Sequence, residues 1–357
     1  MRKKVLALFI SIVFAAGCSG AGNAGSGAAT GPDAATGAQT AAAQSDASAA
    51  AQTGATETAQ ADTAQAASTG PQPSIQAAAA ESGGPVTITD MKGREVTLTE
   101  PATRVIGLTA DDCENLYAIG AGDTLVGRGE YCDYPPEVSN IPSVQSGTDT
   151  NLEQIIALKP QLLLMDTMNQ TKEQVTALEN AGITCVVLDA QDIGGVYTEI
   201  ELLGELMGMQ DNAEKVINDM KAGFAAVSAD ADKNKGKTVY FEVSPLQYGL
   251  WAAGSGTFMD EVAGMLGLTN CFSDVSGWAQ ISEEQVIARN PDYIVTISMY
   301  TGDGPKPDEE IMGRTGWDKI TAVKNKAVLV LENNELSRPT YRLADGAKLL
   351  DEFVNGH

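Results

Sequence analysis

The side chains that support acid–base or metal chemistry are unevenly represented in this 357-residue chain. It has 47 Asp and Glu residues, 23 Lys and Arg residues and one histidine, His357, its last residue. This scarcity excludes a His-rich zinc or manganese site, and it excludes a serine or cysteine nucleophile that depends on a histidine base. The carboxylates show no spacing that marks a catalytic pair. We therefore expect a binding protein without a cofactor rather than an enzyme, with an extracytoplasmic hydrolase as the minor alternative. The net charge of −24 argues against nucleic acid as a partner.

A ten-residue pattern occurs twice in the chain. Residues 151–160 read Asn-Leu-Glu-Gln-Ile-Ile-Ala-Leu-Lys-Pro, and residues 282–291 read Ser-Glu-Glu-Gln-Val-Ile-Ala-Arg-Asn-Pro. Each copy begins with a helix-capping residue that is followed three positions later by Gln, and each ends at Pro before an apolar, β-prone run. The repeat predicts a short helix, a Pro turn and a buried strand in each of two similar α/β lobes, with a ligand cleft between them.

The N-terminus carries export features. Arg2, Lys3 and Lys4 precede an apolar stretch over 5–16, and Ala-Ala-Gly-Cys follows at 15–18. Residues 1–18 are typical of a signal peptide whose end resembles the lipobox of bacterial lipoproteins, which implies a diacylated Cys18 and an extracytoplasmic protein anchored to the cell membrane. Residues 19–84 contain no Lys, Arg or aromatic residue and predict a disordered tether.

Strands and helices alternate after the tether. A hairpin is expected over 86–90 and 95–99, at the start of a first lobe that spans residues 85–193. The expected strands of this lobe are 104–109, 124–127, 161–166 and 184–189, and the expected helices are 110–119, 152–158 and 172–181. This alternation predicts a parallel sheet.

A long apolar periodicity without Pro predicts one connecting helix over 194–229, in which Gly208 marks a point where the helix can break. The second lobe, 230–357, repeats the alternation with strands expected at 238–243, 293–297 and 327–331. The predicted fold is α/β, with two Rossmann-like lobes joined by a single long helix. A helical connection should limit the movement of the lobes when ligand binds.

These features together resemble the substrate-binding proteins of bacterial ABC importers for ferric siderophores and cobalamin. The resemblance covers residues 85–357. It is carried by Thr-Asp-Met-Lys-Gly-Arg at 89–94, the two copies of the repeat, Gly-Ser-Gly-Thr-Phe at 254–258 and Ser-Arg-Pro at 337–339. It implies a membrane permease and an ATPase as partners.

The resemblance also implies a role for one acidic residue in each copy of the repeat. In the family an acidic residue on each lobe docks onto arginines of the permease, and Glu153 and Glu284 are the matching positions. A second interpretation is that each carboxylate favours the positive end of a helix dipole, at about 0.3–1 kcal/mol. The two interpretations are compatible.

The same resemblance narrows the choice of ligand. Tyr-Cys-Asp-Tyr-Pro-Pro at 131–136 looks like a loop of cobalamin-binding members, so Tyr131 and Trp278 are expected to face a corrin from opposite lobes. Tyr248, Trp251 and Tyr300 are weaker candidates. At Ser-Gly-Thr 146–148, where cobalamin binders often place an aromatic residue, the chain has none.

Three arginines favour a different ligand, an anionic ferric siderophore, over a corrinoid. Arg128, Arg338 and Arg342 are available for it, although Arg338 and Arg342 can equally fix the C-terminal helix. We expect a corrinoid first, a ferric siderophore second and haem third. A surface receptor that senses haem or an iron chelate without transporting it is the alternative function.

Overall fold

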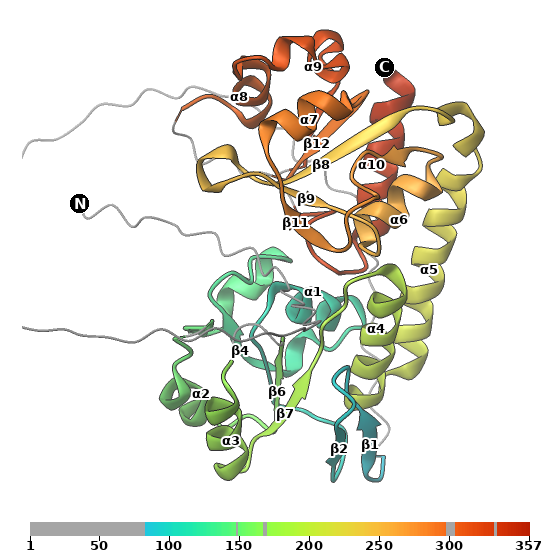
Figure 1. The fold of residues 1–357 in the computed structure, drawn as a ribbon. Coiled ribbons are helices and arrows are strands. Elements are labelled where there is room, and N and C mark those ends of the chain that lie inside the picture. The colour runs from blue at the N-terminus through green and yellow to red at the C-terminus, as the bar shows by residue number, and fades with distance from the viewer. Residues whose placement is uncertain (1–82, 148, 167–169, 298–303, 332–333) are drawn as a thin grey trace, which may run out of the picture. The chain divides into compact units, whose positions relative to one another are not determined.

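The computed structural model describes residues 83–147, 149–166, 170–297, 304–331 and 334–357 (Figure 1). The first element is a hairpin of β1 (Val86–Thr89) and β2 (Glu95–Leu98), paired antiparallel as expected. The signal segment 1–18 and nearly all of the expected tether 19–84 lie outside the described residues, so these boundaries remain predictions.

The first lobe is built on a parallel sheet with the strand order β5-β4-β3-β6-β7. Its strands are β3 (Val105–Gly107), β4 (Leu125–Gly129), β5 (Ser143–Val144), β6 (Leu162–Met165) and β7 (Thr184–Val187). Its helices are α1 (Ala110–Ala118), α2 (Leu152–Leu158) and α3 (Lys172–Asn180). The parallel sheet, four strands and three helices predicted for this lobe are confirmed. The two-residue strand β5 escaped prediction because it is too short to show a periodicity.

The segment expected as one helix over 194–229, with a possible break at Gly208, forms two helices that separate at Gly208, so the break is confirmed. These are α4 (Ile193–Met207) and α5 (Gln210–Ser228). Gly208 ends α4 with a φ of 66°, a left-handed conformation that strains residues with a side chain. The two helices pack on each other, and α5 also packs on helices α6 and α10 of the second lobe. The connection between the lobes is therefore α5 alone, which runs alongside both of them in Figure 1.

The second lobe has a mixed sheet with the order β11-β9-β8-β12-β13, and β10 also pairs with β8. Its strands are β8 (Thr238–Ser244), β9 (Trp251–Ala253), β10 (Thr269–Asn270), β11 (Trp278–Gln280), β12 (Tyr293–Thr296) and β13 (Val328–Val330). Its helices are α6 (Phe258–Met265), α7 (Glu283–Arg289), α8 (Pro307–Gly313), α9 (Thr321–Asn325) and α10 (Leu343–Gly356). The three strands expected in this lobe, β8, β12 and β13, pair in parallel, whereas β9 runs antiparallel to both β8 and β11.

Short 3-10 helices fill several connections of both lobes. They span Gly122–Thr124, Pro136–Asn140, Ala231–Asn234, Leu246–Tyr248 and Trp317–Lys319. Each has three to five residues, which is the usual length for this helix type.

Each sheet is covered on both faces. In β6 the side chains alternate, so that Leu162 and Leu164 enter a core shared with α4, α5 and α10, while Leu163 enters a separate cluster. In β8, Val239 and Phe241 join the shared core, while Tyr240 enters a third cluster with Trp317. The shared core continues from one lobe to the other, which fixes α5 between them.

The repeat predicted from the sequence is present in both lobes. Helices α2 and α7 begin at Asn151 and Ser282, whose side chains accept a hydrogen bond from the backbone three residues on. Both helices end at a left-handed residue, Lys159 with a φ of 50° and Asn290 with a φ of 46°. All four residues of β6 and of β12 are buried. The predicted sequence of helix, Pro turn and buried strand is confirmed twice.

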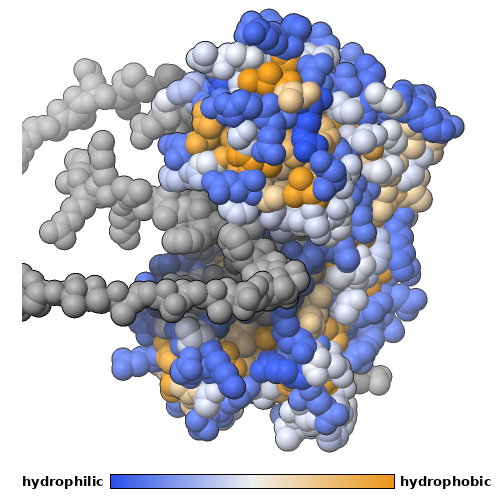
Figure 2. All heavy atoms as spheres, in the orientation of Figure 1, coloured by the Kyte–Doolittle hydropathy of each residue, from blue (hydrophilic) through white to orange (hydrophobic). Residues whose placement is uncertain are grey.

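Hydrophilic residues dominate the visible face of the molecule, with separate hydrophobic areas between them (Figure 2). Among the described residues, no helix combines the length and the apolar character that crossing a bilayer requires.

Candidate functional site

The first lobe places polar side chains at the carboxyl ends of its strands. From β3 the chain proceeds to β4 and β5 on one side of the sheet, and β6 and β7 lie on the other side. In open parallel sheets, the crevice outside such a reversal of strand order is where ligands bind. The segment after β3 begins α1 with Asp111 and Asp112, β6 is followed by Asp166, and β4 is followed by Tyr131.

One group of contacts joins α1 to the segment that precedes α10. Arg338 donates to Glu114 at 2.7 Å and to Asp133 at 2.6 Å. Glu114 is fully buried, and burial raises the pKa of its carboxyl although Arg338 and Arg342 counteract that rise. Burial alone would lower the pKa of the Arg338 guanidinium, but its bonds to Asp133 and the charge of Glu114 raise it. Arg338 therefore links two carboxylates of the first lobe to the second lobe.

Arg342 takes part in the same group. It donates to Glu335 at 3.0 Å and lies 3.6 Å from Glu114. Its guanidinium also stacks 4.0 Å from the centre of the Tyr134 ring. The sequence left two roles open for Arg338 and Arg342, binding an anionic ligand or fixing the C-terminal helix. In the structure both form ion pairs that hold the start of α10.

A second group of contacts lies around Gln191, which follows β7. The Trp278 indole nitrogen donates to the Gln191 side chain at 3.1 Å, and the Phe258 backbone donates to the Gln191 carbonyl at 3.0 Å. The rings of Trp278 and Phe258 pack 5.3 Å apart. Trp278 begins strand β11, because its backbone pairs with Ala253 of β9. It is half-buried and connects the lobes.

The remaining candidate aromatics differ in exposure. Tyr131 is 49% exposed and Tyr248 is 53% exposed, whereas Trp251 is half-buried. Tyr300 lies outside the described residues. Two large tyrosine rings, one in each lobe, are therefore accessible to a ligand.

Arg128, expected to bind an anionic ligand, donates to neighbouring backbone carbonyls. Its guanidinium donates to the backbone carbonyls of Gly129 at 3.0 Å and Glu130 at 3.4 Å. These bonds hold the side chain along the end of β4, beside the loop that carries Tyr131.

Comparison with known proteins shows which family this architecture represents. The model of the family described as "Periplasmic binding protein" matches residues 105–335. The chain belongs to the periplasmic binding protein family. The family expected from the sequence, and with it the role of a binding protein, is confirmed.

Individual relatives cover most of the described part of this periplasmic binding protein. YvrC of Bacillus subtilis, an uncharacterized ABC transporter substrate-binding lipoprotein, is 33% identical over 276 residues, which are 76% of this chain and 85% of YvrC. The vitamin B12-binding protein of Salmonella typhimurium is 33% identical over 253 residues, 70% of this chain and 89% of the relative. The crystal structure of an Fe3+-hydroxamate transport protein from Saccharomonospora viridis superposes with a TM-score of 0.63 at 26% identity, covering 75% of this chain and 98% of that one.

Glu153 and Glu284 occupy equivalent places in this periplasmic binding protein. Each stands in the first turn of its helix, α2 or α7, and each side chain is exposed. The hydrogen bonds from its own backbone N–H and from Ser282 lower the pKa of Glu284. Both carboxylates are free to meet a partner surface, which leaves the docking and the helix-dipole interpretations compatible.

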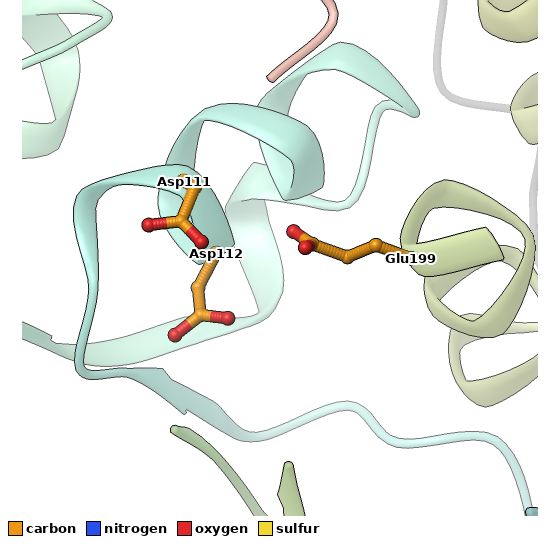
Figure 3. A group of neighbouring side chains, drawn as sticks. All are labelled: Asp111, Asp112 and Glu199. Carbon is orange, nitrogen blue, oxygen red and sulfur yellow. The ribbon is translucent and has the colours of Figure 1, made fainter. Parts of the chain in front are cut away.

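A cluster of three carboxylates was missed by the sequence analysis. It consists of Asp111, Asp112 and Glu199, contributed by α1 and α4 (Figure 3). Burial, together with the charge of Asp166, raises the pKa of Asp111 to about 6. Burial and the charge of Asp111 raise the pKa of Asp112 and of Glu199 well above the ordinary range. Asp111 and Asp112 have the pattern of ordinary helix-start residues, and nothing in the sequence shows that Glu199 faces them.

Two hollows lie away from these groups. One, of about 590 Å³, is in the second lobe, and another, of about 390 Å³, is between α4 and α5. The walls of the first include Arg314 and Glu310, which pair with each other at 2.6 Å. Neither hollow contains any residue that the sequence analysis proposed for ligand binding.

Proposed function

We propose that this protein captures a corrinoid between its two lobes and delivers it to the permease and ATPase of an ABC importer. The observation that carries the choice of ligand is the state of the arginines. A free guanidinium is what an anionic ferric siderophore or the haem propionates need. Of the candidate arginines, Arg338 and Arg342 are already paired with carboxylates, and Arg128 donates to two backbone carbonyls.

The charges around the inter-lobe contacts favour a ligand without net negative charge. Arg338 is neutralised by Glu114 and Asp133, and Arg342 is held by Glu335. An anionic chelate would have to displace these carboxylates to reach either arginine, whereas a corrinoid presents amides and a flat, partly apolar ring.

The exposed tyrosines suit the same ligand. Tyr131 and Tyr248 each leave about half of their surface accessible and come from different lobes. Flat rings of this kind offer large contact areas to a macrocycle. The vitamin B12-binding relatives support this choice, while the hydroxamate transport protein makes a ferric hydroxamate the second candidate.

Ligand titration tests the proposal. The exported chain would be titrated with cyanocobalamin, cobinamide, haem, a ferric hydroxamate and a ferric catecholate, by tryptophan quenching and calorimetry. We expect saturable binding of the corrinoids and none of haem or the catecholate. Binding of a ferric chelate with no corrinoid binding would show that the arginines exchange their carboxylate partners for ligand.

Glu153 and Glu284 are proposed to dock onto the permease, since they are exposed at the same point of both lobes. The double variant Glu153→Ala, Glu284→Ala should bind ligand with unchanged affinity and lose uptake into cells. Glu173 and Asp318, exposed acids near the starts of other helices, form the matched control pair. Lost affinity in the docking variant, or lost uptake in the control, would contradict the assignment.

Cys18, which lies outside the described residues, is proposed as the lipid anchor, with 19–84 as the tether. The Ala-Ala-Gly-Cys sequence and the lipoprotein relative YvrC support it. Cys18→Ser should move the protein from the membrane fraction to the soluble extracytoplasmic fraction. Retention in the membrane fraction would show a different attachment.

A further inference from the structure

The three carboxylates of the cluster converge from two helices. One oxygen from each of Asp111, Asp112 and Glu199 lies within 4.8 Å of the others. Glu199 reaches from α4 toward the first turn of α1, where the two aspartates stand (Figure 3). Asp112 and Glu199 are 1% and 0% exposed, while Asp111 is half-buried. The cluster is therefore enclosed on the side of α4 and accessible through Asp111.

Of the four carboxylate oxygens of Asp112 and Glu199, two accept hydrogen bonds that support the fold and two do not. Asp112 uses Oδ2 to accept from the Thr109 backbone at 3.1 Å, as part of the box that caps α1. Glu199 uses Oε1 to accept from the Asn115 amide at 2.8 Å. Asp112 Oδ1 and Glu199 Oε2 are fully buried and have no hydrogen-bond partner among the described residues. Buried oxygens without a partner carry a desolvation cost that a ligand can offset.

Two acids whose charges act on the cluster, Asp189 and Glu114, are each paired with a cation. Lys92 pairs with Asp189 at 2.9 Å, and Arg338 pairs with Glu114 at 2.7 Å. Within the described residues, no lysine or arginine forms an ion pair with any member of the cluster. Enclosed carboxylates in proteins are normally paired with a cation or coordinate a metal.

We propose that Asp111, Asp112 and Glu199 bind a divalent cation of the Ca²⁺ type. Ca²⁺ prefers carboxylate oxygens at about 2.3–2.6 Å, so two oxygens bound to one ion lie at most about 4.6–5.2 Å apart, a limit that oxygens within 4.8 Å of one another can meet. Mg²⁺ requires shorter distances of about 2.0–2.1 Å and a stricter octahedron. The half-buried Asp111 provides the route of entry, and water completes the coordination. The site is separate from the choice of organic ligand, so it stands or falls independently of the corrinoid proposal.

Thermal unfolding and calorimetry of the exported chain test the site. After treatment with EDTA, the protein would be titrated with CaCl2, MgCl2 or MnCl2 up to about 10 mM, a range that covers extracellular calcium modules. We expect a saturable rise in Tm with Ca²⁺ and one binding event per chain in calorimetry. Glu199→Gln should weaken the Ca²⁺ affinity by about tenfold or more, because affinity follows the number of charged ligands.

Two further variants keep the test decisive. Glu201→Gln, an exposed position on the same helix, is the matched control and should bind Ca²⁺ like the wild type. Asp111→Asn changes the half-buried member of the cluster and should weaken Ca²⁺ binding even if Glu199→Gln fails to fold. No saturable Tm shift with Ca²⁺, a response confined to Mg²⁺ or Mn²⁺, or equal Ca²⁺ affinity in wild type and both cluster variants would overturn the proposal.

Discussion

Enclosed glutamates of the two lobes can have different surroundings, as Glu242 and Glu199 show. In the second lobe, Glu242 of β8 is 1% exposed and accepts two hydrogen bonds from Arg314, at 2.6 and 2.9 Å. In the first lobe, Glu199 of α4 is 0% exposed, and its single hydrogen bond comes from the neutral amide of Asn115. Burial raises the pKa of both carboxyls, but only Glu242 has an arginine that counteracts the rise.

This difference separates a structural carboxylate from one that is available to a ligand. Arg314 also pairs with Glu310 and stacks 4.4 Å from the Trp317 ring, so the counter-charge of Glu242 is held in place within the second lobe. The first lobe leaves buried oxygens of Asp112 and Glu199 without a partner. Equal burial therefore means rigidity in one lobe and binding capacity in the other.

The largest effect is expected from breaking the balanced pair. Arg314→Leu should lower the free energy of unfolding by about 3–5 kcal/mol, because Glu242 is left enclosed without a counter-charge. Urea denaturation measures this loss. Lys215→Met, which removes an exposed pair with Asp219, is the control and should change the free energy of unfolding by about 0.5 kcal/mol or less. Equal losses in the two variants would erase the distinction between enclosed and exposed pairs.

The direct comparison uses matched neutral substitutions in buffer with EDTA. Glu242→Gln should lower the free energy of unfolding by about 2 kcal/mol, since Arg314 loses its charged acceptor. Glu199→Gln should leave it unchanged or raise it, because the pKa of this enclosed carboxyl is raised and no cation among the described residues offsets the cost of ionising it. A destabilised Glu199→Gln protein would show that the charge of Glu199 supports the fold.

Substitution of one aromatic residue in each lobe compares what the two lobes contribute to ligand affinity. Tyr131→Ala should weaken corrinoid binding by about tenfold, or about 1.4 kcal/mol, without changing stability, because its ring is exposed. Trp278→Ala should weaken binding at least as much and also lower Tm, because its ring packs on Phe258 and bonds to Gln191. Ile156→Ala, an exposed apolar position on α2, is the control. Unchanged affinity in either tyrosine or tryptophan variant would remove that residue from the ligand site.

The smallest effect concerns Asp90, an enclosed carboxylate of the first lobe whose oxygens are satisfied. Burial would raise its pKa, but hydrogen bonds from Arg94, Val187 and Lys92 lower it below the usual 3.8. A lowered pKa stabilises the fold above the unfolded value, and this contribution disappears as pH falls through the folded value. Asp90→Asn should therefore cost about 1 kcal/mol at pH 6 and little at pH near 2.5, measured as unfolding free energy against pH. A constant difference across this range would contradict the ionised role.

Local patterns in the sequence were sufficient for much of the fold. The capping residues Asn151 and Ser282, followed by Pro160 and Pro291, fixed both copies of the repeat, since these signals act within a few residues. The strands of the parallel sheet were visible as apolar runs. Strands β9 and β11 were not, because three residues held by antiparallel pairing carry no period of their own. Gly208 was noted as a possible break, but whether the helix ends there depends on the packing of α4 on α5.

The sequence by itself determined the class of the protein. The two-fold repeat, the absence of histidine before the last residue and the order of motifs specified a two-lobed binding protein, because each of these acts locally or through composition. The engagement of Arg338 by Glu114 and Asp133 was decided only in three dimensions, as was the meeting of Glu199 with Asp111 and Asp112. These contacts join residues far apart in the chain, and a charge in a sequence does not reveal whether folding will supply its partner.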